Sequence, residues 1–110
     1  MIMLWVETIV CSAKRGSDAR LRRMLLARQE FKRRQDGCIG AWMGRGAEDG
    51  MMLLVQSVFQ SANHWKTISD SVKATFDAKD GGLESLLLGP PLVGIFEIPP
   101  EELQSLVFSS

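Results

Sequence analysis

Two side chains in this sequence have the chemistry of a proton-transfer site. Glu7 interrupts the apolar stretch Leu4–Ser12, where a carboxylate on an otherwise buried face requires a partner or a wet cavity. His64, the single histidine, stands in the first turn of a predicted helix. A histidine or a desolvated carboxylate can act as a base near neutral pH, so we take both as candidate catalytic residues. The alternatives are a strand-end carboxylate paired with an arginine and a ring that faces solvent.

Aromatic side chains and two amides accompany these residues in the neighbouring predicted elements. Aromatic walls with a few polar groups suit a flat, apolar ligand. Asn63 or Gln56 would stabilise an oxyanion that develops on such a ligand. Residues 65, 68, 72 and 76 recur at helical spacing, so plain core is the competing interpretation. The predicted pocket residues are Trp5, Trp42, Gln56, Phe59, Asn63, Trp65, Phe76 and Phe96.

The stretch 51–76 must position most of these side chains. Residues 51–59 are apolar at both alternating sets of positions, which predicts a strand covered on both faces. Ser61 is placed to cap the helix that follows, its oxygen accepting from a backbone N–H near His64. Ser69, Asp70 and Ser71 favour caps over helix interiors, so we expect an interruption and a second helical piece beginning near Val72.

Periodicity and turn residues place the other elements. Strands are predicted at 4–12, 38–46 and 92–98, and the first helix runs from Ser17 or Asp18 to near Gly37. Glycines at 40, 44 and 46 predict a bulge or a close approach in the second strand. The order is strand, helix, strand, strand, helix, strand. This order predicts one ferredoxin-like α+β domain over residues 1–110, with an antiparallel sheet and both helices on one face. Its core is expected at about 4–98, followed by a tail at 99–110 in which residues 101–108 are amphipathic.

Composition narrows the class of protein. The 110 residues are 45% hydrophobic and 24% charged with net charge zero, as in a soluble globular domain. No apolar run is long enough to span a bilayer, and no secretory leader is recognisable, so we expect a cytoplasmic protein. Cys11 and Cys38 are predicted as buried reduced thiols. A structural zinc site needs four ligands, and the single histidine lies far from both thiols in sequence, so no metal is expected. Nine basic residues lie between positions 14 and 34, but they point all round the helix, which favours a solvated face over a nucleic-acid surface.

The strands carry more apolar surface than two helices can cover. Two helices shield one face of a four-stranded sheet, whereas strands 4–12, 51–59 and 92–98 are apolar on both faces. Burying about 600 Å² on each subunit contributes roughly 15 kcal/mol before the costs of association. We therefore expect a homodimer formed by sheet-to-sheet packing.

Two motifs stand at the start of the second predicted strand and at the end of the third: Gly37-Cys38-Ile39-Gly40 and Ser57-Val58-Phe59-Gln60-Ser61. With these motifs the chain resembles the dimeric α+β barrel superfamily, specifically its antibiotic-biosynthesis-monooxygenase-like (ABM) domains. Residues 57–61 are similar to the family's Glu-x-Trp-x-Ser, with Ser57 and Phe59 replacing the acid and the tryptophan. Trp65, Ile68 and Ser71 follow where the family has an aromatic residue, a tryptophan and a serine. The resemblance implies a homodimer, a pocket between sheet and helices, and activities that include cofactor-independent oxygenation of polycyclic aromatic substrates.

The haem-degrading branch of that superfamily is a poor match. Its asparagine, tryptophan and axial histidine correspond here to Glu7 or Thr8, Ile68 and Ala78, so no haem or other cofactor is expected. Two hypotheses therefore stand. The first is a cofactor-free monooxygenase acting on a small aromatic or polycyclic substrate. The second is a non-catalytic dimeric module of the same fold that binds a ligand or a partner.

Overall fold

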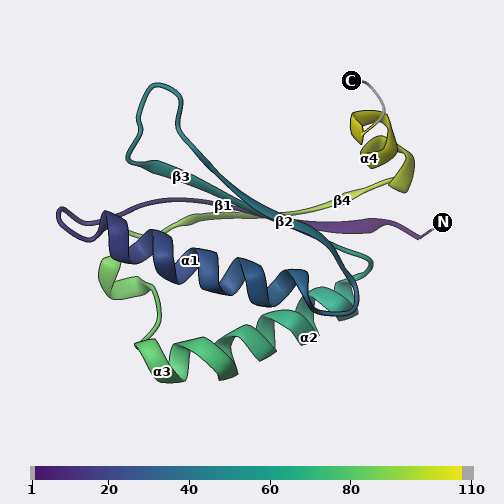
Figure 1. Ribbon diagram of the computed structural model, residues 1–110. Helices are drawn as coiled ribbons and strands as arrows, with labels where there is room; N and C mark the ends of the chain where they lie inside the picture. Colours follow the sequence, from purple (N-terminus) through teal and green to yellow (C-terminus); the bar gives the residue numbers. More distant parts are fainter. Residues whose placement is uncertain (1, 108–110) are drawn as a thin grey trace.

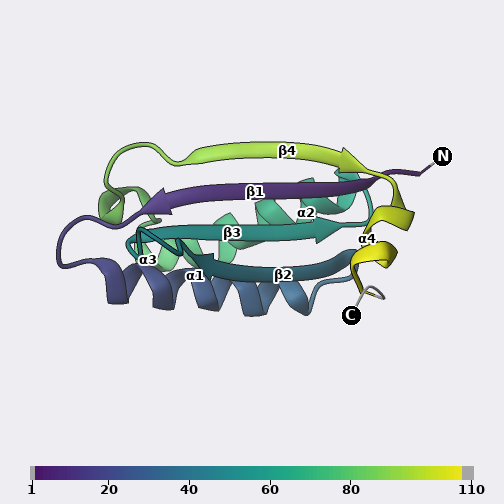
Figure 2. The same cartoon turned by 90° about the horizontal axis from the view of Figure 1, so that it is seen from above.

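A four-stranded antiparallel sheet carries two long helices on one face in the computed structural model (Figure 1). The structure describes residues 2–107, with the backbone alone at 105–107. The strand order is β2-β3-β1-β4, which Figure 2 shows from above the sheet. The predicted ferredoxin-like α+β arrangement is confirmed. The main elements are β1 (Leu4–Ser12), α1 (Asp18–Arg33), β2 (Cys38–Arg45), β3 (Met52–Phe59), α2 (Ala62–Val72), β4 (Leu92–Ile98) and α4 (Pro100–Val107).

Helix α1 begins and ends where local chemistry favours it. Asp18 stands in its first turn, and Lys32 and Arg33 stand in its last, so each charge opposes the helix macrodipole. The chain leaves the helix through Gly37, whose φ of 92° is a backbone conformation that side chains disfavour. The bulge expected in the second strand is present, between Cys38 and Gly40.

Helix α2 confirms one expectation and corrects another. The Ser61 hydroxyl accepts from the backbone N–H of His64 at 3.2 Å, as predicted for the cap. The interruption predicted at residues 69–71 is wrong, because regular helix continues to Val72. The irregularity follows as a wider π turn, η1 (Lys73–Asp77), before α3 (Ala78–Asp80) ends at a left-handed Gly81. Cap-forming side chains can remain inside a helix when the backbone hydrogen bonds continue past them.

Two apolar clusters fill the space between the sheet and the helices. One joins Cys11 and Leu53 of the sheet to Leu21 and Leu25 of α1, and it extends to Leu86 in the short helix η2 (Glu84–Leu86). The other cluster lies at the opposite end of the strands. It contains Phe59, Ile68 and Val72, with Trp5, Phe31, Cys38, Trp65 and Phe76 packed against them.

The second face of the sheet, which we call the outer face, is apolar and open in the single chain. Leu92 is 72% exposed and Phe96 is 55% exposed on β4, and Trp42 and Met52 are also exposed. Figure 1 shows α4 on this side of the sheet, opposite α1 and α2. Phe108, the last residue of the amphipathic segment predicted at 101–108, lies outside the described residues. Among residues 2–107, no helix has the length and apolar character needed to cross a membrane.

Candidate active site

A band of polar side chains separates the two apolar clusters. Strand pairing places Glu7 of β1 directly opposite Ser57 of β3, on the face that the helices cover. Arg28, Gln29 and Lys32 of α1 are buried above them. Burying polar and charged groups costs free energy unless they are paired, so each group in this band needs a partner in the protein or in a ligand.

The centre of the band is a contact between Lys32, Glu7 and Ser57. The Lys32 Nζ donates to Ser57 Oγ at 3.3 Å and lies 3.9 Å from Glu7 Oε1. The indole N–H of Trp65, from α2, donates to Glu7 Oε2 at 2.9 Å and so orients the carboxylate. Burial lowers the pKa of Lys32, although the charge of Glu7 opposes the shift. The amine therefore loses its proton more readily than an exposed lysine does.

A cavity of about 220 Å³ opens beside these groups, between the sheet and the helices. Its walls are mostly apolar, and its polar groups come from the band and from the end of α2. Gln29 is one of them: the residue is 93% buried, and its Oε1 has no hydrogen-bond partner among the described residues. An unpaired acceptor in a cavity wall is the environment that a ligand donor would satisfy. The lining residues are Glu7, Ile9, Leu25, Arg28, Gln29, Lys32, Ala41, Val55, Gln56, Ser57, Ser69, Val72, Lys73, Asp77 and Leu83.

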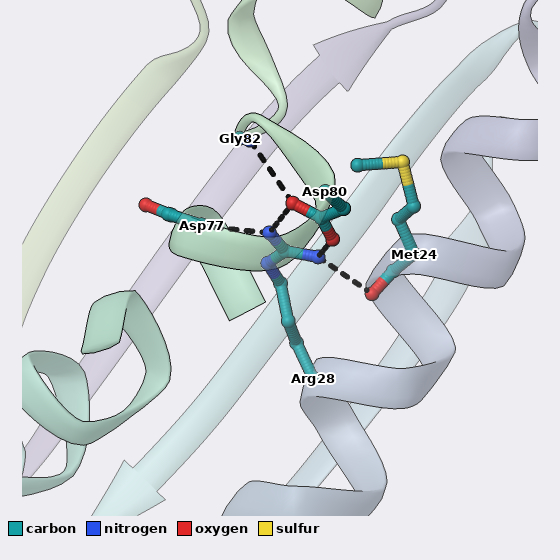
Figure 3. A network of polar contacts seen from close by, with 5 residues as sticks. All are labelled: Met24, Arg28, Asp77, Asp80 and Gly82. Carbon is teal, nitrogen blue, oxygen red and sulfur yellow. Dashed lines mark hydrogen bonds and ion pairs between the residues drawn. The ribbon is translucent and has the colours of Figure 1, made fainter. Parts of the chain in front are cut away.

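Arg28 ties α1 to the irregular end of α2 at the edge of this cavity (Figure 3). Its guanidinium donates to Asp77 at 2.8 Å, to both Asp80 oxygens at 2.8 and 3.0 Å, and to the backbone carbonyl of Met24 at 3.2 Å. The π turn holds Asp77 in reach, and the Phe76 ring lies 5.3 Å from the guanidinium carbon. Burial alone would lower the pKa of Arg28, but the two carboxylates outweigh it and raise that pKa. The Arg28 hydrogen bond lowers the pKa of Asp80.

The structure divides the residues predicted from sequence among three places. Glu7 lies in the cavity wall, and the side chains of Trp5, Phe59, Trp65 and Phe76 lie on the same side of the sheet in the second apolar cluster.

The outer face takes three of the other predicted residues. The Trp42 indole donates to Gln56 Oε1 at 2.8 Å, and the Gln56 amide donates to Thr8 at 3.2 Å. Phe96 pairs with Val6 on that face. The sheet therefore separates Trp42 and Phe96 from Glu7, whereas Gln56 also borders the cavity although its amide bonds to Trp42 and Thr8.

His64 and Asn63 line a different, more open hollow between the end of α1 and α2. The His64 Nδ1 lies 2.8 Å from Ser61 Oγ, and its ring packs against Gly37. The structure does not bring the two candidate catalytic residues to one cavity.

Sequence reasoning missed Arg28, Gln29, Lys32 and Ser57. A signal for two of them existed, because positions 21, 25, 28 and 32 follow one helical face. Arg28 and Lys32 therefore stand on the same stripe as Leu21 and Leu25. Within residues 2–107, no three His, Cys, Asp or Glu side chains come together as ligands for a metal.

Solved structures share this fold. A proposed antibiotic biosynthesis monooxygenase from Nitrosomonas europaea superposes with a TM-score of 0.75 at 11% identity, covering 87% of this chain and 90% of that one. SnoaB, a cofactor-independent oxygenase from Streptomyces nogalater studied as a mutant, gives 0.71 at 14% identity, covering 84% and 90%. A protein from Deinococcus radiodurans, also proposed as an antibiotic biosynthesis monooxygenase, gives 0.73 at 18% identity, covering 86% and 92%.

No protein-family model matches the sequence, and neither does any curated protein. The structural likeness therefore shows the fold: this chain has the same ferredoxin-like α+β fold as these structures. The resemblance noted from residues 37–40 and 57–61 is confirmed at that level.

Proposed function

We propose that this chain is a cytoplasmic, cofactor-independent monooxygenase that acts on a small aromatic substrate with an acidic hydroxyl group. The observation that carries the proposal is the polar band of Glu7, Lys32 and Ser57, buried between two apolar clusters and open to a cavity. Titratable groups with a perturbed pKa, such as Lys32, cluster at functional sites. The proposal is also supported by the fold that the chain shares with a protein named as a cofactor-independent oxygenase.

The cavity limits the size of the substrate. Pockets for drug-sized ligands measure about 300–1,000 Å³. The volume here, about 220 Å³, is smaller, which favours one or two fused rings over a larger polycyclic system. The mostly apolar walls suit the ring, and the polar band offers donors to one ring oxygen.

The reaction needs no external reductant. A hydroxyarene loses its hydroxyl proton, and the anion attacks O₂ through a ring carbon to form a carbon–oxygen bond. The resulting peroxide breaks its O–O bond and, with the hydrogen on that carbon, releases water and leaves a carbonyl group. For 1-naphthol the balance is C10H8O plus O₂ to C10H6O2 plus H₂O: the substrate gives four electrons, and both oxygen atoms are accounted for.

The band supplies the proton transfer. Burial lowers the pKa of Lys32 and so favours the amine form, which takes the hydroxyl proton; the resulting ammonium stabilises the anion beside it. Glu7, held by Trp65, in turn stabilises that ammonium. Ser57 accepts from the amine and keeps it directed along the cavity wall. His64 lines a separate hollow, so the geometry favours Glu7 over His64 among the residues predicted from sequence.

Oxygen uptake with 1-naphthol and with the three-ring anthrone tests the proposal. We expect faster turnover of the two-ring compound, a loss of about 100-fold or more in Lys32→Met and Glu7→Gln, and little change in His64→Ala. Product analysis should find the quinone and water, without hydrogen peroxide. Absence of uptake with both compounds, while both bind in the cavity, would instead support the non-catalytic ligand-binding module.

We further propose that two copies pack through their outer faces. Exposed Leu92, Phe96, Trp42 and Met52 form a surface of the kind that soluble monomers rarely leave open. Phe96→Asp would place a charge in this contact, and we expect sedimentation to shift from dimer to monomer. Leu26→Asp is the matched control, because Leu26 is exposed on α1 on the other side of the sheet. A monomeric wild-type protein at micromolar concentration would contradict this proposal.

A further inference from the structure

The amine of Lys32 differs from every other lysine nitrogen in the described chain. Lys32 is 91% buried and lines the cavity, whereas Lys14, Lys66, Lys73 and Lys79 are exposed. A lysine in an apolar, partly dry site is more often neutral and therefore nucleophilic. Burial lowers the pKa of Lys32, which favours this neutral form.

The neighbours of this amine are arranged to assist an attack on a carbonyl group. Glu7 Oε1, at 3.9 Å from Nζ, is a proton acceptor, and Ser57 Oγ, at 3.3 Å, orients the nitrogen. Gln29 stands one helical turn before Lys32, and side chains at this spacing are neighbours on the helix surface. Within the part of the chain that the structure describes, its buried Oε1 lacks a donor. A hydroxyl group formed next to Lys32 would be that donor.

We propose that Lys32 condenses with small aromatic aldehydes that enter the cavity, forming a Schiff base. The lysine nitrogen forms a bond to the carbonyl carbon as the carbon–oxygen double bond becomes single, and the carbonyl oxygen takes a proton released by that nitrogen to become the hydroxyl of a carbinolamine. That hydroxyl donates to Gln29 Oε1. The carbon–oxygen bond then breaks, the hydroxyl leaves as water with the second proton of the nitrogen, and the carbon–nitrogen bond becomes double. One aldehyde and one amine give one imine and one water, so no oxidant or reductant is needed.

The cavity decides which aldehydes fit. Ile9, Leu25 and Val55 form apolar wall beside the polar band. A single ring with one aldehyde group would place the ring against these side chains and its carbonyl carbon at the amine. This activity does not depend on the proposed oxygenation, since it requires neither O₂ nor an acidic hydroxyl group.

Reductive trapping tests this inference. The folded protein is incubated at neutral pH with benzaldehyde and cyanoborohydride, which reduces an imine to a stable secondary amine, and peptides are mapped over time. We expect Lys32 to be modified faster than Lys73, because the cavity holds the aldehyde beside its amine and burial lowers the pKa of that amine. Lys73 is the matched comparison, since it lies at the same cavity but is exposed.

Three controls make the result decisive. In urea all five lysines should react at similar rates, which would show that the fold creates the selectivity. Lys32→Arg keeps the cation, should lose the adduct at position 32 and should leave the other rates unchanged. Gln29→Leu should slow modification of Lys32 about fivefold, as expected for one lost hydrogen bond, with an unchanged unfolding midpoint. Modification of Lys32 no faster than that of Lys73 in the folded protein would overturn the inference, whatever the outcome of the oxygen-uptake assay.

Discussion

Replacing Arg28 with methionine tests whether the Arg28 ion pairs hold the irregular end of α2 against α1. The side chain is 6% exposed and bonds to Asp77, which is 44% exposed, and to Asp80, which is 25% exposed. Breaking a fully buried ion pair costs about 3–5 kcal/mol. Because water can reach both carboxylates once the guanidinium is gone, we expect a smaller loss, about 2 kcal/mol in the free energy of unfolding.

Urea denaturation followed by tryptophan fluorescence measures this loss, and thermal unfolding should show a fall of about 8 °C in Tm for a domain of this size. Lys66→Met is the matched control, because Lys66 and Asp70 form an exposed pair on one helix that should contribute about 0.3 kcal/mol. A double-mutant cycle of Arg28→Met with Asp80→Asn should yield a coupling energy of about 1 kcal/mol or more.

The pH dependence of the free energy of unfolding gives a second test of the contact between Arg28 and Asp80. Arg28 lowers the pKa of Asp80, so the stability from this pair is present above the ordinary carboxyl pKa of about 3.9 and is lost as the pH falls through the lower folded-state value. Arg28→Met should therefore lose less stability below about pH 4 than the wild type does. A free energy of unfolding for Arg28→Met within about 0.5 kcal/mol of wild type would refute the reasoning.

Three further substitutions test other parts of the structure. The pKa of Lys32 is lower in the folded chain than the ordinary lysine value of about 10.4, so between the two values the unfolded chain holds this proton more tightly. The free energy of unfolding should therefore rise with pH in that interval, and Lys32→Met should remove the rise in urea titrations. Ser61→Ala should cost about 1 kcal/mol by chemical denaturation, whereas Ser17→Ala, whose hydroxyl makes no cap bond, should change stability by less than about 0.5 kcal/mol. Gly37→Ala should cost about 3 kcal/mol, because its φ is 92° and its new Cβ would overlap the imidazole ring packed against it. Gly16→Ala, with a φ of 84° and open space around it, should cost only about 1 kcal/mol in the same assay.

Local patterns predicted most of the fold. The first and fourth strands have the bounds expected from alternation, and the capping role of Ser61 follows from a hydroxyl placed before a helical pattern. The error at residues 69–71 has a physical reason: cap preference is a local tendency of under about 1 kcal/mol per residue, and packing of Ile68 and Val72 holds the helix through it. The irregular turn at Lys73–Asp77 had no comparable signal.

The candidate site was predictable in part. Glu7 stood out because a carboxylate inside an apolar strand needs a partner. Its partner Lys32 was lost among many basic residues of one helix, although its spacing from Leu21 and Leu25 marks the buried face. Ser57 had no distinguishing feature until strand pairing placed it opposite Glu7.

The amino-acid sequence by itself determined the order of strands and helices and the excess of apolar sheet surface. These properties follow from short-range periodicity and from turn residues. Only the tertiary structure decided which side chains meet. Alternation assigns Trp42 and Glu7 to faces of their own strands, but which face the helices cover depends on pairing between strands far apart in the chain. That pairing places Glu7, Ser57 and Lys32 around one cavity and leaves Trp42 on the opposite side of the sheet.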